Sequence, residues 1–354
     1  MPLDLSLNLA TVRRQWKLLE AVAAAVRHGF GGVAPWREMV DETGIAEAAR
    51  IFQGSGLRVT GYCRGGLFAA GGAEKFREAV DDNKRMIDEA AAIGAECIVV
   101  IGGGLAPGSR DLPAARALFA DGLAAVLPHA RAAGVALALE PMHPMYAADR
   151  GCITTIKEML DIADALGNDG VGIAVDTYHV WWDPELAPQL ARAGTRIIAH
   201  HICDWLVPTK HLLTDRGMMG DGVIDFRAIR RMVEEAGYCG IQEVEIFSEE
   251  WWSRPGDEVL ATAVERFRTV CMPEDGGRRT GTDLSSVLRP QRQKRDRAGA
   301  RPGYSAAAGT ATGSSCFSMT ERSGSSQKPH MPAPMTSMMA AMIHGASQLP
   351  AWAK

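Results

Sequence analysis

A repeated unit constrains the fold of this 354-residue chain more than any other feature. Within residues 1–271, a short apolar segment, a loop and an amphipathic, alanine-rich segment follow one another eight times. The apolar segments are short and almost free of polar positions, as the strands of a helix-covered parallel sheet are. The expected strands are 3–7, 31–34, 58–62, 97–101, 135–140, 171–176, 196–201 and 241–246.

The segments between these strands have the pattern of helices. They are expected at 11–28, 43–54, 73–93, 112–133, 154–166, 185–193, 225–236 and 256–270. Several are followed by glycine, the usual residue after a helix end, as at Gly94, Gly134 and Gly237. Eight such units in about 270 residues fit an α/β fold of the (β/α)₈ TIM barrel type. The alternative, a doubly wound sheet, usually has a glycine-rich phosphate turn after its first strand, and no such turn follows 3–7.

The composition changes near Cys271. Residues 272–354 are rich in glycine, serine, arginine and proline and show no sustained periodicity, which is typical of a low-complexity, disordered tail. We therefore expect a TIM-barrel catalytic domain over 1–271 and a tail over 272–354. The tail is basic and is interpreted either as an incidental extension or as an interaction segment.

Charge and cysteine usage limit the partners and the compartment. Residues 1–271 carry 27 lysines and arginines against 37 aspartates and glutamates, so this acidic body is a poor candidate for binding nucleic acid. Residues 1–10 are a poor signal peptide, and no apolar run reaches the roughly 18–20 residues that span a bilayer. The seven scattered cysteines include no Cys-x-x-Cys pair. We expect a cytoplasmic protein with reduced thiols and no membrane partner.

Strands five to eight each carry, at or next to their last position, a polar residue that an apolar strand tolerates poorly unless it is paired or bound. These strands read VALALE, VGIAVD, RIIAHH and IQEVEI, and the residues are Glu140, Asp176, His201 and Glu245. In a TIM barrel the carboxyl ends of the strands meet at one face, so the four side chains can converge. Three carboxylates and one imidazole suit a divalent metal, with Mn²⁺ or Mg²⁺ preferred and Co²⁺ as a third candidate.

Two neighbouring residues compete for places in this set. Side chains alternate along a strand, so only one of His200 and His201 can point inward, and His201 is preferred because it leads into the loop. Glu243 points the same way as Glu245 but lies deeper. Glu245 is therefore the expected ligand, and Glu243 is expected to be a buried partner.

The segments around these residues resemble a known family. They read LEPMHPMYAADR, VDTYHVWWDP, HHICDW, GDGVIDF and EVEIFS. They are similar to the xylose isomerase-like TIM barrel superfamily, and most closely to its sugar phosphate isomerase/epimerase branch. The resemblance covers roughly residues 3–271 and is most specific for strands five to eight. It implies that Glu140, Asp176, His201 and Glu245 bind the metal and that His179 contacts substrate.

The resemblance also implies a reaction, with a small-molecule carbohydrate as substrate. A sugar isomerase or epimerase of this kind removes a proton next to a carbonyl through a metal-bound enediolate, with Glu140 and Glu245 as the acid/base pair. The ketose epimerases carry an arginine a few residues beyond the strand-seven histidine. Here that stretch reads DWLVPTK, so the identity of the substrate does not carry over.

Further residues on the loops at the same face are candidates for substrate binding. Arginines there could bind a carboxylate or phosphate, although each one alone is more often a solvated charge, and a tryptophan could stack on a sugar ring. With His179, the expected substrate-binding residues are His143, Arg150, Trp181, Asp204 and Arg216.

Other functions are left open by the sequence. A metal-dependent lyase or dehydratase acting on a keto-sugar or inosose would use the same proton abstraction and then expel a leaving group. An endonuclease IV-like phosphodiesterase fits less well, because its three-metal cluster needs more histidines and acids. A binding protein without catalysis also fits less well, because a buried carboxylate cluster is costly without its cation. Assembly into a homo-oligomer is left open.

Overall fold

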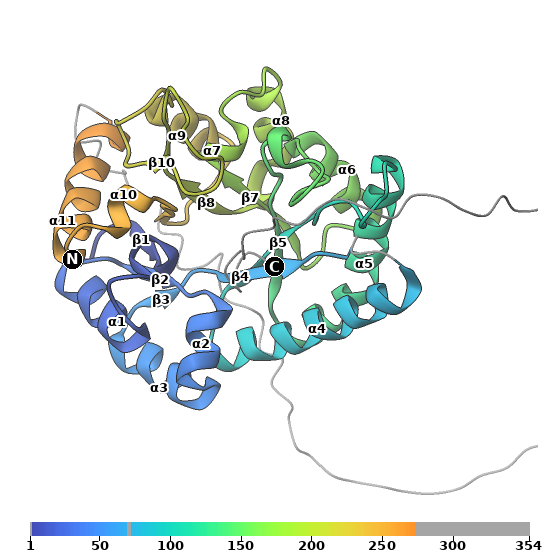
Figure 1. The fold of residues 1–354 in the computed structure, drawn as a ribbon, viewed down its shortest axis with the longest axis horizontal. Coiled ribbons are helices and arrows are strands. Elements are labelled where there is room, and N and C mark those ends of the chain that lie inside the picture. Colours follow the sequence, from blue (N-terminus) through green and yellow to red (C-terminus); the bar gives the residue numbers. More distant parts are fainter. Residues whose placement is uncertain (1, 69–71, 274–354) are drawn as a thin grey trace, which may run out of the picture. The chain divides into compact units, whose positions relative to one another are not determined.

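Nine parallel strands form one sheet that curls into a barrel, and helices surround it (Figure 1). The computed structural model describes residues 2–68 and 72–273. The strands of the barrel are β1 (Leu5–Asn8), β2 (Gly32–Ala34), β3 (Arg58–Val59), β4 (Tyr62–Gly66), β5 (Cys97–Ile101), β6 (Ala136–Leu139), β7 (Val171–Asp176), β8 (Ile197–Ile202) and β11 (Gln242–Val244). Their order, β3-β2-β1-β11-β8-β7-β6-β5-β4, places β11, the last strand among the described residues, beside β1.

The pieces β3 and β4 together occupy the place of the third strand. The sequence predicts a continuous strand at 58–62, but the structure divides it between β3 and β4. Val59 of β3 bridges to Ala95 before β5, and Cys63 of β4 bridges to Trp36 after β2. β3, which pairs with β2, is thus bridged to the segment before β5, and β4, which pairs with β5, is bridged to the segment after β2. The ring of eight strand positions is therefore nearly closed. This confirms the predicted TIM barrel.

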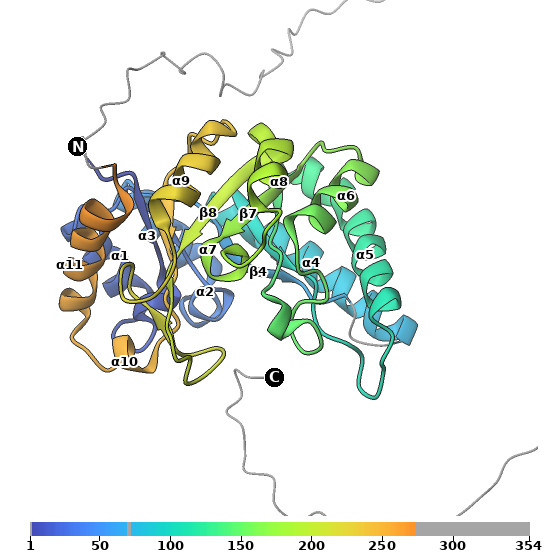
Figure 2. The ribbon, with the colours of Figure 1, turned by 90° about the horizontal axis from the view of Figure 1, so that it is seen from above.

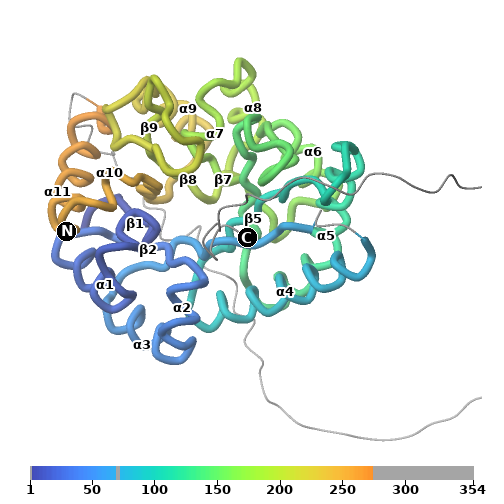
Figure 3. Tube along the Cα trace, viewed as in Figure 1, coloured from blue at the N-terminus to red at the C-terminus, as the bar shows by residue number. Residues whose placement is uncertain are grey.

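The helices form the outer layer, and the chain runs round the barrel in sequence order (Figure 3). In the view of Figure 2, β4, β7 and β8 run through the centre between α9 and α11 on one side and α4, α5 and α6 on the other. The helices are α1 (Leu18–Arg27), α2 (Arg37–Thr43), α3 (Ile45–Ser55), α4 (Gly72–Ile93), α5 (Leu112–Ala133), α6 (Ile156–Leu166), α7 (Thr177–Val180), α8 (Leu186–Ala193), α9 (Phe226–Glu235), α10 (Glu249–Trp252) and α11 (Gly256–Arg266).

Short elements complete the loops at the carboxyl ends of the strands. Two antiparallel strands, β9 (Asp204–Trp205) and β10 (Arg216–Gly217), pair in the segment after β8. Single turns of helix occur at η1 (Leu9–Val12), η2 (Pro144–Tyr146) and η3 (Gly194–Arg196), and η4 (Phe267–Cys271) continues α11.

Two helix predictions in the first quarter of the chain are wrong in detail. The helix predicted at 11–28 begins only at Leu18, because the preceding residues form η1 and an irregular turn. The helix predicted at 43–54 is preceded by α2, and Gly44 separates the two with a φ of 84°. A helix break at a positive φ is favourable for glycine, which lacks the Cβ that would clash there.

Small side chains fill the interior of the barrel below the strand ends. Cys97, Ala138, Ala174 and Ala199 form one buried cluster. The three alanines lie two residues before the predicted metal ligands Glu140, Asp176 and His201, respectively. Because side chains alternate along a strand, each alanine and its ligand share the inward face. The interior therefore leaves room for polar groups at its upper end.

Residues 274–354 lie outside the described part of the chain, so the tail predicted over 272–354 and the domain boundary at 271 stay predictions. Within the described residues, no helix is both long and apolar enough to cross a membrane.

The packing of α5 gives a test of this fold. A Cβ added at Gly122, in the middle of α5, would lie 2.1 Å from a ring carbon of the buried Phe68. We expect Gly122→Ala to lower the free energy of unfolding by about 1–3 kcal/mol through overpacking. Gly54→Ala in α3 has no atom within 4 Å of its new Cβ and should raise this free energy by about 0.5–1 kcal/mol. Urea unfolding of both variants would measure this, and the same sign for both would contradict the packing described.

Candidate metal centre and active site

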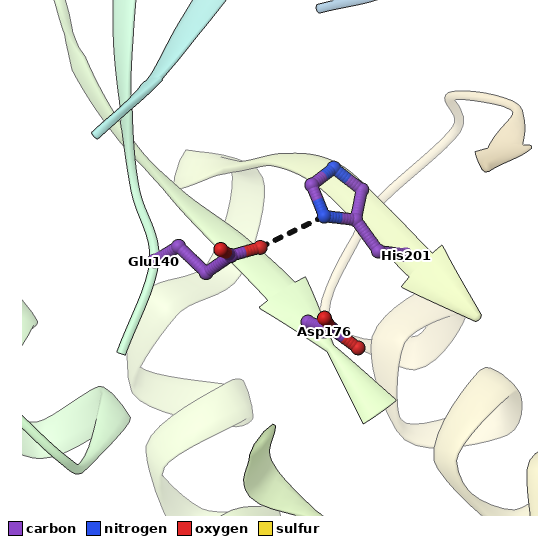
Figure 4. A group of neighbouring side chains, drawn as sticks. All are labelled: Glu140, Asp176 and His201. Carbon is purple, nitrogen blue, oxygen red and sulfur yellow. Dashed lines mark hydrogen bonds and ion pairs between the residues drawn. The ribbon is translucent and has the colours of Figure 1, made fainter. Parts of the chain in front are cut away.

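Three predicted ligands converge at the carboxyl end of the barrel. Glu140 follows β6, Asp176 ends β7 and His201 lies in β8, and one potential ligand atom from each is within 4.8 Å of the others. Figure 4 shows the imidazole of His201 facing the carboxylate of Glu140, with Asp176 beside them. The His201 Nδ1 atom is 2.8 Å from Glu140 Oε1. All three side chains are buried.

Strand register brings these residues together. Asp176 of β7 pairs with His201 of β8, and His201 pairs with Glu243 of β11. Because paired residues of parallel strands point to the same side, the side chains of Asp176, His201 and Glu243 enter the barrel in one layer. His200 points the other way, where its ring contacts Gln242 and Tyr238. The structure thus places His201, and not His200, at the cluster.

Glu245, the fourth predicted ligand, lies next to this group but is held by other partners. Its Oε1 accepts a hydrogen bond of 3.0 Å from the Asn8 amide, and its Oε2 is 2.9 Å from Arg216 Nη1. The same Arg216 nitrogen is 3.2 Å from Asp176 Oδ2. Arg216 therefore bridges two of the predicted ligands, and its guanidinium lies over the ring of Tyr178. Its own side chain is buried.

The electrostatics show that this cluster carries excess negative charge. Burial raises the pKa of Asp176 to about 6 and that of Glu245 to about 7, although the charge of Arg216 acts in the opposite direction at both. Burial opposes protonation of His201, but the carboxylates of Glu243 and Glu140 outweigh it and raise the pKa of His201 well above its usual value. Each shift favours a state that brings a proton into the cluster.

The donor set fits a divalent cation. The carboxylates of Glu140, Asp176, Glu243 and Glu245 are all buried, and His201 and Arg216 make the cationic contacts to them among the described residues. A buried carboxylate is costly unless it is paired with positive charge or hydrogen bonded. Oxygen-rich sites with one imidazole favour hard or borderline divalent ions. Glu140, Asp176 and His201 could hold such an ion, with Glu245 as the neighbouring fourth donor.

Two histidines on the loops lie beside this cluster. His179 is buried, with Nε2 at 3.5 Å from Asp176 Oδ2 and 3.3 Å from Arg216 Nη2, and its Nδ1 accepts from the backbone N–H of His143. The ring of His143 stacks on Trp205 at 4.6 Å between centroids. Burial lowers the pKa of His143 to about 4 and that of His179 well below normal, so both are neutral near pH 7.

The predicted substrate-binding residues are distributed unevenly around the centre. Trp181 is partly buried and contacts Trp205, in the same aromatic group as His143. Arg150 is partly buried on the loop after β6, where its charge adds to the effect of burial in lowering the pKa of Arg64. Asp204 accepts backbone hydrogen bonds from residues 205, 220, 222 and 224, so it anchors the loop after β8. A direct contact of Asp204 with substrate stays a prediction.

The comparisons with known proteins agree with this architecture. Residues 22–270 match the family model of the xylose isomerase-like TIM barrel. The chain belongs to this family.

Individual proteins are also similar to the chain. An inosose isomerase from Bacillus velezensis is 24% identical over 281 residues, which are 76% of this chain and 97% of the relative. A solved structure of a protein from Sinorhizobium meliloti 1021 is 59% identical, with a TM-score of 0.75 and coverage of 76% of this chain and 99% of that one. A structure of the IOLI protein with a bound zinc atom has a TM-score of 0.67 at 21% identity, covering 76% and 98% of the two chains.

Because the chain belongs to this family and is similar to these relatives, it is an enzyme of the isomerase and epimerase type. Within this xylose isomerase-like barrel, Arg216 bridges Asp176 and Glu245, a position that the sequence does not predict. The hydrogen bond that Thr60 donates to the buried Glu243 is likewise not predicted by the sequence. The signal available for Thr60 was a polar residue inside the strand predicted at 58–62, but threonine is also common in turns.

The position of Arg216 predicts a large effect on stability. In metal-free protein at pH 8, Arg216→Met should lower the free energy of unfolding by about 3–5 kcal/mol, because it leaves Asp176 and Glu245 buried without their cation. At pH 5 the loss should be smaller, since carboxyl groups with pKa values of about 6 and about 7 are protonated there and need no counter-charge.

A matched control is Arg192→Met, because Arg192 also bridges two carboxylates, those of Asp161 and Asp164, but at the surface. That loss should stay below about 1 kcal/mol. Urea unfolding in the presence of a chelator would measure both variants. Equal losses for the two variants would show that the Arg216 contacts are not the buried ion pairs described.

Proposed function

We propose that this xylose isomerase-like barrel is a divalent-metal-dependent isomerase or epimerase that moves a proton next to the carbonyl of a keto-sugar or inosose. The observation that carries the proposal is the convergence of buried Glu140, Asp176 and His201, with Glu245 alongside, where the strands end. In TIM-barrel enzymes the active site is at this end of the barrel.

The two glutamates are proposed to act as the acid/base pair. Glu140 follows β6 and Glu245 follows β11, and β7 and β8 lie between those strands in the sheet. A sugar bound above the strand ends would therefore meet one carboxylate from each side. One glutamate removes the proton from carbon and the other returns one to the neighbouring carbon or to the opposite face.

The metal would be held by Glu140, Asp176, His201 and Glu245. When bound, it supplies a Lewis acid that polarises a carbonyl oxygen and makes the adjacent carbon-bound proton more acidic. Mn²⁺ or Mg²⁺ is proposed from the three carboxylates in this set, and Co²⁺ and the zinc seen in the IOLI neighbour are further candidates to compare.

The surrounding side chains support a neutral, ring-shaped substrate. His143 and Trp181 each contact the ring of Trp205, and His143 and His179 are both neutral. Aromatic faces stack on the apolar side of a sugar ring, while neutral imidazoles exchange hydrogen bonds with its hydroxyl groups. His143, His179 and Trp181 are therefore proposed as substrate contacts, with Arg150 at the edge of the site.

Metal binding should depend on pH. Since Asp176 and Glu245 have pKa values raised to about 6 and about 7, a cation must displace their protons at lower pH. We expect the apparent affinity for Mn²⁺ to rise between pH 5.5 and pH 8. The stability of metal-free protein should change with pH in the opposite direction to the metal affinity. The raised carboxyl pKa values stabilise the fold below about pH 4, and this contribution is lost as the pH rises through 6 to 7. Calorimetric titration and unfolding at each pH would measure both, and a pH-independent affinity would contradict the ligand set.

Isotope exchange tests the reaction itself. With Mn²⁺ in D₂O, a substrate from a panel of keto-sugars and inososes should take up deuterium at the carbon next to its carbonyl, which NMR detects. Glu140→Gln and Glu245→Gln should each lower this exchange at least about 100-fold, because each removes a general acid or base.

The matched control is Glu89→Gln, because Glu89 is a partly buried glutamate paired with Arg37 on the outer side of the barrel. It should leave exchange unchanged. Loss of a leaving group after exchange would identify the lyase reaction instead. Absence of exchange with every member of the panel in metal-loaded protein would overturn the proposed catalysis.

A further inference from the structure

A further carboxylate, that of Glu243, lies on the Nε2 side of the His201 ring, whereas Glu140 lies on the Nδ1 side. Glu243 is 3% exposed, and its Oε1 is 3.6 Å from His201 Nε2. Its register partner on β8 is His201, so the two side chains enter the barrel next to each other. Glu243 is not among the three residues whose ligand atoms converge.

The carboxylate of Glu243 is fixed from two directions by hydrogen-bond donors. Asn8 Nδ2 donates to Oε1 at 2.8 Å, and Thr60 Oγ1 donates to Oε2 at 2.8 Å. The hydroxyl of Thr60 is in turn 2.7 Å from that of Ser6. Glu243 is therefore held in place by β1 and by the turn after β3, and one of its oxygens remains directed at the imidazole.

The His201 ring has two distinct nitrogen atoms, and one of them lacks a partner. Nδ1 faces Glu140, which belongs to the converging group, so Nδ1 is the atom turned toward the metal position. Nε2 is buried and has no hydrogen-bond partner among the described residues. An unpaired polar atom in a dry interior is costly, and the nearest carboxylate oxygen is that of Glu243.

We infer that Glu243 is a positioning residue that accepts a hydrogen bond from His201 Nε2–H and so keeps the lone pair of Nδ1 available to the metal. This inference rests on the proposed metal site and assigns a role to a residue outside the ligand set. A neutral imidazole that ligates through Nδ1 carries its hydrogen on Nε2. A carboxylate behind a metal-bound histidine fixes this tautomer and the ring orientation, and its loss typically costs 10–100-fold in metal affinity.

The 3.6 Å separation is longer than a hydrogen bond, so the inferred bond requires the His201 ring to move toward Glu243, whose carboxylate is held by Asn8 and Thr60. Asn8 couples this pair to the rest of the centre, because its amide nitrogen donates to both Glu243 and Glu245. The amide oxygen of Asn8 accepts a hydrogen bond of 2.7 Å from Trp36 Nε1, which fixes the orientation of the amide. Asn8 is thus held by Trp36 and in turn holds both glutamates of this segment.

The experiment compares Glu243→Gln and Glu243→Asp with the wild-type chain, using Zn²⁺ as the diamagnetic probe. Zinc affinity is measured by competition with a chelating dye, and the two ring nitrogens of His201 are followed by ¹H–¹⁵N NMR in zinc-loaded protein. We expect both variants to lose 10–100-fold in affinity and to show faster exchange of the Nε2 proton. Glu243→Asp keeps the charge but withdraws the carboxylate, so an effect of charge alone would leave its affinity unchanged and overturn the inference.

Glu89→Gln serves again as the matched control and should change neither readout, since Glu89 contacts Arg37 and Tyr62 instead of His201. Variants of Glu243 that lower the melting temperature but keep the zinc affinity and the His201 nitrogen shifts would show a purely structural role and overturn the inference. If the wild-type chain binds no zinc, Mn²⁺ or Mg²⁺, the proposed metal function itself fails, and the inference fails with it.

Discussion

Repulsion among the buried carboxylates at the ends of β6, β7 and β11 is the constraint on which the rest of this site depends. Such groups are retained in an apolar interior only if positive charge and hydrogen-bond donors compensate for lost hydration. In the described structure Arg216 compensates Asp176 and Glu245, while Asn8 and Thr60 compensate Glu243. Even so, burial keeps the pKa values of Asp176 and Glu245 raised. The remaining imbalance is what a divalent cation would remove.

The barrel provides for this arrangement through the size of its interior residues. Alanines at 138, 174 and 199 occupy the inward face two residues before Glu140, Asp176 and His201. Larger side chains there would fill the space that Glu243 and the lower part of the cluster need. The same alternation along each strand that brings three ligands inward also turns His200 outward, against Tyr238. Geometry of the sheet thus decides which of two adjacent histidines can take part.

This alternation explains how much could be predicted. A polar residue at the end of an apolar strand is easily recognised in the sequence, and the fold class indicates where such strand ends meet. The positions of Glu140, Asp176 and His201 could therefore be predicted. The contacts of Arg216 and Asp204 were not, because both lie in the long segment after β8, where no periodicity relates a residue to its partner. The split of the third strand and the late start of α1 were missed for a similar reason: irregular turns depend on tertiary contacts more than on local pattern.

The position of Arg216 also bears on which substrates the site can accept. Its Nη1 donates hydrogen bonds to Asp176 and Glu245, and its Nη2 faces His179. Its buried Nε has no hydrogen-bond partner among the described residues. A phosphate or carboxylate on the substrate would have to reach the buried Nε, or displace a contact of Nη1 or Nη2 and leave a buried carboxylate without its counter-charge. Arg216 is therefore better placed as a fixed charge for the cluster than as a receptor for an anionic group. This favours a substrate recognised through hydroxyl groups and a carbonyl, as the neutral His143 and His179 beside it also suggest.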